Sequence, residues 1–258
     1  MTGAVRIVQR NAVVYRHVWH GSVFSSFLQP TLYLTALGFG VGSLIDPRRA
    51  DAIAGGVTYL RFLAPGLLTA TCMQVASFES SWPVIGKIIW RRNYQAMLAT
   101  PLGVDDLIAG ELLWIGIRLT TLGTAFVVVA LACGAMRITP ATLISLFVAV
   151  ITGLAFSAPI LAYAAMLKSG DDFNILHRLI ISPLFMFSGV FFPIDRLPMP
   201  LQRVAEISPL YHGVQLVRGL ALGQIEVSVA MAHLSYLLVL FTAGFLVARS
   251  TFRRKLYA

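Results

Sequence analysis

Charged side chains are scarce in this sequence. Only 12% of the 258 residues are Asp, Glu, Lys or Arg, whereas 57% are hydrophobic. The mean hydropathy is +0.79. A water-soluble core cannot bury so large an apolar share, so the composition predicts an integral membrane protein rather than one or two soluble domains.

Cysteine is nearly absent as well. Cys72 and Cys133 lie in separate apolar runs, without a partner at the spacing of a zinc or redox motif. A disulfide scaffold and a metal site are therefore not indicated. His17 and His20 stand three residues apart, but no cysteine or carboxylate completes a metal site around them. We expect neither catalytic nor metal-ligating residues in this chain.

A phosphate-binding loop of the form G-x-x-x-x-G-K-[ST] is also missing. Gly86 and Lys87 are followed by Ile88 and lack the upstream glycine, so the chain cannot hold ATP by this device. The net charge of +9 would suit a nucleic-acid-binding protein. The basic residues, however, lie between or beside apolar segments rather than along one polar face, which argues against nucleic acid as a partner.

The sequence does contain long apolar segments. Because about 20 apolar residues cross a bilayer as a helix, we predict an all-α integral membrane protein with a single domain over residues 1–258. Its six predicted spans are approximately 22–45, 59–85, 107–133, 141–167, 175–192 and 227–249.

Three further segments are amphipathic. Residues 1–20 carry an apolar stripe at helical spacing, which predicts a helix lying in the membrane surface. Residues 193–226 hold four prolines and mixed charge, which predicts short, re-entrant-like helices in the outer interface between spans five and six. Residues 86–106 predict a short amphipathic helix, then an N-cap at Thr100 with Pro101 in the first turn of the next span. The stripe in residues 1–20 is made of Val5, Val8, Ala12, Tyr15 and Trp19.

The distribution of Lys and Arg predicts the orientation. Twelve of the 20 fall on the side of the two termini and of the loops 86–106 and 168–174, seven fall on the other side, and Arg118 lies within a span. Cytoplasmic loops carry the excess of positive charge. We therefore predict that both termini and these two loops are cytoplasmic and that the protein is a multi-pass protein of the inner or plasma membrane.

Five motifs occur in order and on the predicted sides of these spans: FLAPGLL, FESSW, WRRNYQAMLATPL, SGVFFPIDRLP and ISPLYHGVQLVRG. Together they resemble the permease subunit of ABC-2 type exporters, most closely the NodJ-like lipo-oligosaccharide and drug-export permeases. The resemblance covers almost the whole chain and leaves the cargo open. It implies a half-transporter that dimerises, sits among membrane lipids and works with a separate ABC ATPase, which would bind the ATP and Mg.

The resemblance also implies a coupling helix and a connecting helix. Carried over to this chain, the coupling helix covers residues 87–98 and the connecting helix residues 5–19. A docking helix needs apolar knobs and steering cations, but an interfacial helix with snorkelling arginines would show the same pattern. The candidate coupling residues are Arg91, Arg92, Tyr94, Met97 and Leu98, and those of the connecting helix are Val8, Tyr15 and Trp19.

Several polar and aromatic residues are candidates for pairing or substrate contact. Glu111 and Arg118 are seven apart on one helix face and are expected to pair along the helix or across the dimer. Glu79 is expected to cap the second span or to pair with the neighbouring basic loop. The candidate outer-gate or substrate contacts are Phe191, Phe192, Tyr211 and His212.

The function predicted from these observations is ATP-driven export of an amphipathic or lipid-linked substrate, such as a glycolipid, a lipo-oligosaccharide or a drug. An ion-gradient-driven secondary transporter is the alternative, but its usual internal repeats and mid-membrane charges are not evident here. A membrane enzyme would need convergent His, Asp or Glu residues, whereas the five histidines are scattered along the sequence.

Overall fold

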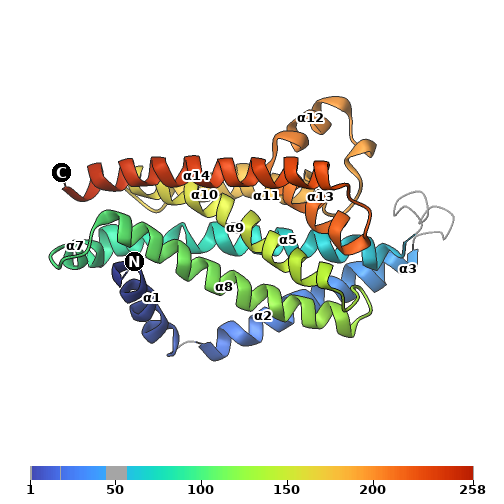
Figure 1. The fold of residues 1–258 in the computed structure, drawn as a ribbon, viewed down its shortest axis with the longest axis horizontal. Helices are drawn as coiled ribbons and strands as arrows, with labels where there is room; N and C mark the ends of the chain where they lie inside the picture. Colours follow the sequence, from blue (N-terminus) through green and yellow to red (C-terminus); the bar gives the residue numbers. More distant parts are fainter. Residues whose placement is uncertain (1, 18, 45–56, 258) are drawn as a thin grey trace.

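The computed structural model describes residues 2–17, 19–44 and 57–257, and within these ranges every regular element is a helix (Figure 1). The first elements are α1 (Thr2–Tyr15), α2 (Trp19–Tyr33), η1 (Leu34–Val41), α3 (Gly42–Leu44), α5 (Tyr59–Glu79), α6 (Trp82–Ile85), η2 (Gly86–Trp90) and α7 (Asn93–Leu98). They are followed by α8 (Val104–Ala132), α9 (Pro140–Met166), α10 (Asp172–Leu176), η3 (His177–Ile181), α11 (Ser182–Phe187), η4 (Ile194–Arg196), α12 (Met199–Ile207), α13 (Pro209–Leu222) and α14 (Val227–Tyr257).

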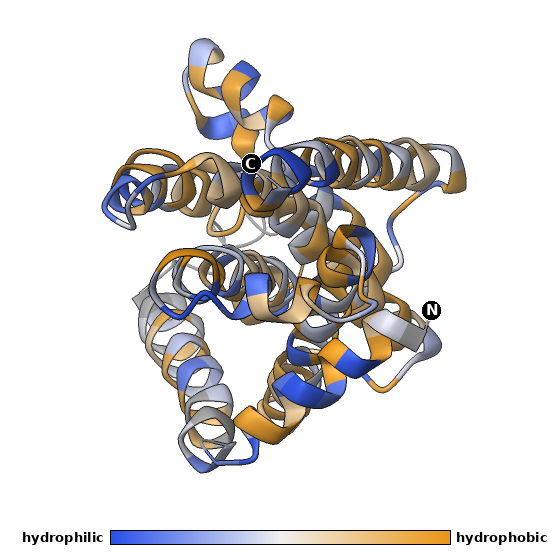
Figure 2. Cartoon of the chain, turned by 90° about the vertical axis from the view of Figure 1, so that its left-hand side faces the viewer, coloured by the Kyte–Doolittle hydropathy of each residue, from blue (hydrophilic) through white to orange (hydrophobic). Residues whose placement is uncertain are grey.

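The long helices run side by side along the molecule. Both termini and α7 lie at one end, called here the terminal end, whereas α12 and α13 lie toward the opposite end (Figure 1). Figure 2 looks at the terminal end and shows hydrophobic residues along the helices and hydrophilic stretches among the segments nearest the viewer. The loops that the charge distribution predicts to be cytoplasmic thus share an end with the termini.

α5 forms the centre of the core. It packs against α8, α9 and α13, and most of its side chains are buried, including Leu63, Leu67 and Met73 at 0% exposure. α9 packs most extensively against α14. Helices in a membrane associate through close packing at small residues. At the α9–α14 crossing a Cβ on Gly244 would come within 2.7 Å of the Pro159 nitrogen, so only glycine allows this approach.

The structure supports three of the six predicted spans. In the described part of the chain, Val104–Ala132, Pro140–Met166 and Val227–Tyr257 are long and apolar enough to cross a membrane, and they match the third, fourth and sixth predicted spans. The other three are built differently. The first predicted span is one run of α2, η1 and α3 with a π-helical middle. The second is α5, which ends at Glu79, followed by the separate short helix α6. The fifth consists of α10, η3 and α11. The six-span count therefore stays a prediction.

Several predicted boundaries were wrong. α8 begins at Val104 with Gly103 as its N-cap, whose N–H donates to Asp106 Oδ2 at 3.2 Å, rather than at Pro101 with Thr100 as the cap. The fifth helical run ends at Phe187 instead of residue 192, and α14 continues through the basic tail to Tyr257. The carboxylate of Asp106 determines the start of α8 because it satisfies a free N–H group there.

Candidate functional site

The candidate site lies at the terminal end, where α1, the end of α5, α6, η2 and α8 enclose a cavity of about 390 Å³. Arg10, Lys87, Arg91 and Arg118 line this cavity together with one carboxylate, Glu79. Trp82, Trp90 and Trp114 form much of the remaining wall. The terminal-end cavity is thus cationic and aromatic, and it lies between the segments predicted to be the connecting and coupling helices.

Glu111 lies beneath the wall of this cavity. Its side chain is 3% exposed, and both carboxylate oxygens accept hydrogen bonds from Lys87 Nζ at 2.7 Å. Asn11 Nδ2 on α1 donates to Glu111 Oε2 at 3.3 Å. A buried carboxylate needs such partners because desolvation destabilises its charged form. Glu111 therefore joins α1, η2 and α8 at one point.

A second ion pair lies further along α8. Arg118 Nη2 is 3.2 Å from Glu79 Oε1 at the end of α5, and the guanidinium lies 4.4 Å from the ring centroid of Tyr15. Tyr15 also packs edge-on against Trp114. The expected pairing of Glu111 with Arg118 is wrong within the chain. Because α5 and η2 pack beside α8, each of these two charges meets a closer partner on a neighbouring segment.

α1 presents a different face from the one that the sequence pattern predicts. Ala4, Ile7 and Asn11 are buried, whereas Val5 is 50% exposed. Gly110 on α8 makes this packing possible, because a Cβ there would lie 2.7 Å from Ile7 Cβ. The helix also ends at Tyr15, so Trp19 belongs to α2. The lone polar residue of the packed face, Asn11, is the one that binds Glu111, and this explains why hydrophobicity alone misplaced the face.

The predicted coupling helix is also interrupted. η2 ends at Trp90 and α7 begins at Asn93, and between them Arg92 adopts a left-handed conformation with φ of 48°. Arg91 and Arg92 are exposed, and Trp90 is 65% exposed. Trp90, Arg91 and Arg92 thus form an exposed segment beside the terminal-end cavity, called here the coupling tip. Trp90 is not among the residues predicted from the sequence, although an exposed aromatic next to two arginines is a typical docking anchor.

Tyr94 does not belong to the exposed surface, contrary to its expected role as a docking knob. Its side chain is fully buried, with its ring 6.1 Å from that of Phe252 on α14 and 5.9 Å from Lys87 Nζ. Burial, together with the nearby negative charge of Glu111, raises the pKa of Tyr94 well above its usual value. Met97 and Leu98 are half-buried against the same core. These three residues anchor the coupling tip.

α14 is joined to the terminal end by exposed charges. Asp105 in the first turn of α8 pairs with Arg249 at 2.8 Å and with Arg253 at 3.0 Å. About half of each side chain is exposed, so these ion pairs contribute little to stability. Their position still places the basic C-terminal turns beside the start of α8.

The other predicted contact residues lie toward the opposite end. Phe191 is half-buried, packs edge-on against Phe185 and accepts a hydrogen bond at its carbonyl from the Tyr59 hydroxyl at 3.2 Å. Phe192 is half-buried beside it. His212 Nδ1 lies 2.8 Å from His233 Nδ1, and Tyr211 packs edge-on against His233. Their role as gate or substrate contacts stays a prediction.

The described residues contain no group of three or more His, Cys, Asp or Glu side chains arranged to hold a metal ion. His17 Nδ1 lies 3.0 Å from the Val13 carbonyl oxygen, and the ring of His20 packs against Trp19. Cys72 is buried, Cys133 is half-buried, and both are free thiols.

Comparison with known proteins adds an independent finding. A model of the ABC-2 type transporter family matches residues 4–222. Nodulation protein J of Rhizobium leguminosarum bv. viciae is 33% identical over 248 residues, which cover 96% of this chain and 93% of the relative. Nodulation protein J of Rhizobium meliloti (strain 1021) is 29% identical, with 98% and 93% covered. The inner membrane transport permease YadH of Escherichia coli (strain K12) is 23% identical, with 93% and 90% covered.

Proposed function

Because the chain belongs to the ABC-2 type transporter family, we propose that it is the membrane subunit of an exporter whose ATPase is a separate chain that docks on the coupling tip. The observation that carries this proposal is the geometry of the tip. Trp90, Arg91 and Arg92 are exposed at the terminal end, whereas Tyr94, two residues further along the chain, is completely buried. An exposed aromatic and two cations on a fixed base are suited to bind a partner's groove.

The proposed mechanism uses the buried contacts behind the tip. Lys87 in η2 pairs with Glu111 in α8, and Glu111 also binds Asn11 in α1. A displacement of the tip would therefore act on α1 and α8 together. An ATPase drives such a change only if its ATP-bound state binds one permease conformation better than the other. In this proposal two copies of the permease are driven in this way and open a route between them.

We further propose that the cargo is an amphipathic or lipid-linked molecule, such as a glycolipid, a lipo-oligosaccharide or a drug. Large apolar side chains on α8 and α14, including Ile117, Leu238 and Val239, are exposed in the single chain. Such surfaces suit contact with lipid, with a second copy or with an amphipathic cargo. In the proposed orientation the terminal end faces the cytoplasm, as the positive charge of its loops favours.

The experiment that tests the partner is co-purification from native membranes in mild detergent. The tagged wild-type chain is expected to bring an ATPase subunit with vanadate-sensitive ATP hydrolysis. The double variant Arg91→Glu/Arg92→Glu is expected to weaken this association at least about tenfold. A loss of about 1.4 kcal/mol of binding free energy raises the dissociation constant tenfold, and reversing two charges at an interface removes at least that much.

The matched control is Arg137→Glu/Arg203→Glu, which makes the same change in charge at two exposed arginines outside the tip. This variant is expected to retain the ATPase. Both variants must be present in the membrane at the wild-type level, which shows that a loss of ATPase association is not caused by misfolding of the permease. Repeated purification of a stable permease without ATPase would overturn the proposal and favour the ion-driven secondary transporter.

A further inference from the structure

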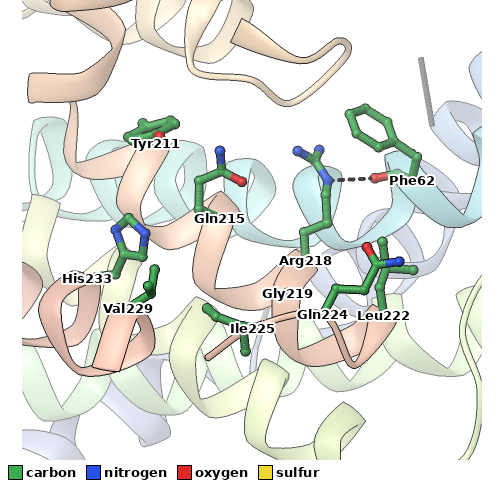
Figure 3. A pocket seen from close by; sticks show the side chains of 10 residues that line it. All are labelled: Phe62, Tyr211, Gln215, Arg218, Gly219, Leu222, Gln224, Ile225, Val229 and His233. Carbon is green, nitrogen blue, oxygen red and sulfur yellow. Dashed lines mark hydrogen bonds between the residues drawn. The ribbon is translucent and has the colours of Figure 1, made fainter. Parts of the chain in front are cut away.

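A second cavity lies at the opposite end of the molecule and contains a buried arginine. Arg218 on α13 is 8% exposed. Its Nε donates to the carbonyl of Phe62 at 3.1 Å (Figure 3), and its Nη2 donates to the carbonyls of Gly189 at 2.9 Å and Val190 at 3.1 Å. The guanidinium also lies 3.8 Å from the ring centroid of Phe62. Arg218 is thus fixed in one orientation.

The charge of Arg218 is not matched by an acid. In the described part of the chain no Asp or Glu forms an ion pair with it, and its protein hydrogen bonds use Nε and Nη2. The two N–H groups of Nη1 therefore have no acceptor among these residues. Carbonyl dipoles offset only part of the cost of burying a cation. A bound anion would supply the missing partner.

The cavity beside this guanidinium has a volume of about 430 Å³, which is within the usual range for small-molecule sites. One face of α13 provides its wall through Tyr211, Gln215, Arg218 and Leu222, which repeat at intervals of four, three and four residues (Figure 3). Gln224 and Ile225 lie in the connection to α14, and Val229 and His233 on α14 close the cavity. The lining of this cavity thus combines amide and cationic groups with apolar side chains.

The backbone around Arg218 is adapted to its position. A Cβ on Gly66 of α5 would lie 2.8 Å from Arg218 Nη2 and 3.0 Å from the Val190 carbonyl oxygen. Only glycine leaves room there for the guanidinium between α5 and the turn at 189–190. The FLAPGLL motif therefore supplies Phe62 and Gly66, and the ISPLYHGVQLVRG motif supplies the cation. Two distant motifs combine to hold one arginine at a cavity wall.

We propose that this cavity binds the acidic group, a phosphate or carboxylate, of an amphipathic molecule, with that group on Nη1 of Arg218 and the apolar part against Ile225 and Val229. The inference deepens the proposed function, on which it rests for the source of the ligand. At the end opposite the coupling tip, the ligand is either the exported amphiphile near its exit or an acidic lipid of the membrane. Both present the same chemistry to the arginine.

Native mass spectrometry of the purified permease with its ATPase provides the test, with phosphatidic acid and diacylglycerol as probes that differ only in the phosphate. The wild type is expected to bind phosphatidic acid at least tenfold more tightly than diacylglycerol. Arg218→Gln is expected to remove most of this preference. Arg203→Gln changes an exposed arginine on α12 outside the cavity and is expected to bind as the wild type does.

A second variant keeps the proposal falsifiable if Arg218→Gln fails to fold. Gln215→Trp leaves Arg218 and its carbonyl partners in place but fills the space beside the guanidinium, so it is expected to lower the affinity for phosphatidic acid at least fivefold. An unchanged affinity in Gln215→Trp would overturn the anion site and leave Arg218 as a structural link between α13 and α5.

The source of the ligand is decided by ATP hydrolysis after reconstitution in neutral lipid. Stimulation by phosphatidic acid in the wild type, lost in Gln215→Trp, assigns the site to exported amphiphiles, whereas binding without stimulation assigns it to a resident lipid, and both outcomes support the site. Binding that persists in a permease without any ATPase partner would support the anion site but contradict the proposed export function. If phosphatidic acid does not bind although the ATPase remains associated, the anion site is contradicted and the proposed export function is supported.

Discussion

Individual charges in this protein differ greatly in the environment that surrounds them. Glu111 is almost completely buried with Lys87, whereas about half of the Asp105 side chain is exposed beside Arg249. The Coulomb attraction between two charges is strong where water is excluded and weak where it is not. Removing one member of a buried pair also leaves the other charge unpaired. The two ion pairs should therefore respond very differently to mutation.

At this scale we predict that Lys87→Met destabilises the protein by about 3 kcal/mol, because it leaves the Glu111 carboxylate buried without its cation. Glu111→Gln added to Lys87→Met should recover at least about 1 kcal/mol as a coupling energy. Thermal unfolding in detergent measures both. The matched control, Asp105→Asn, should cost less than about 1 kcal/mol because its ion pairs are exposed. Equal costs for the buried and the exposed pair would contradict this reading.

Pairs of helices are positioned by glycines at their closest approach. α14 meets α9 where Gly244 lies against Pro159, and α1 meets α8 where Gly110 lies against Ile7. A Cβ on Gly116 of α8 would lie 3.8 Å from Leu154 Cδ1, which is an ordinary van der Waals contact. The helices therefore approach too closely for any side chain at Gly244 and Gly110, whereas Gly116 has room for one.

For the α9–α14 pair we predict that Gly244→Ala lowers stability by about 1–3 kcal/mol, since the new methyl group would overlap the backbone of α9. Gly116→Ala is the matched control in another long helix and should be neutral or slightly stabilising, because alanine favours helix over glycine. Thermal melting of the two variants in the same detergent gives the comparison. A neutral Gly244→Ala would show that α14 can move away from α9 without cost.

The whole molecule places its charged segments at the two ends of the helices. The coupling tip, both termini and the Asp105 cluster lie at the terminal end, and the Arg218 cavity lies at the opposite end. Basic loops favour the cytoplasmic side of a membrane. The arrangement thus gives a polarity to the molecule, with a proposed docking site at one end and a proposed anion site at the other.

We predict that this polarity corresponds to the membrane sides. In a background with Cys72→Ala and Cys133→Ala, a cysteine placed at Met199 on α12, which is 63% exposed, should react with a membrane-impermeant maleimide in intact spheroplasts. A cysteine placed at Thr100, which is exposed at the terminal end, should react only after lysis. A permeant maleimide should label both. The opposite pattern would reverse the proposed orientation.

The sequence by itself determined the class of protein, the family and the three longest helices. These properties follow from composition, periodicity and motifs, which are local features of the chain. It also selected Glu79, Glu111 and Arg118 as charges that need partners, because an isolated charge in an apolar segment is unfavourable.

Only the tertiary structure decided which residues meet. It paired Glu111 with Lys87 and Arg118 with Glu79, buried Tyr94, exposed Trp90 and placed Arg218 beside a cavity. Periodicity assigns a residue to a helix face, but the neighbour of that face depends on how distant helices pack. Gly66 and Arg218 show this most clearly. They are 152 positions apart in the sequence, yet a Cβ added to Gly66 would lie only 2.8 Å from Arg218 Nη2.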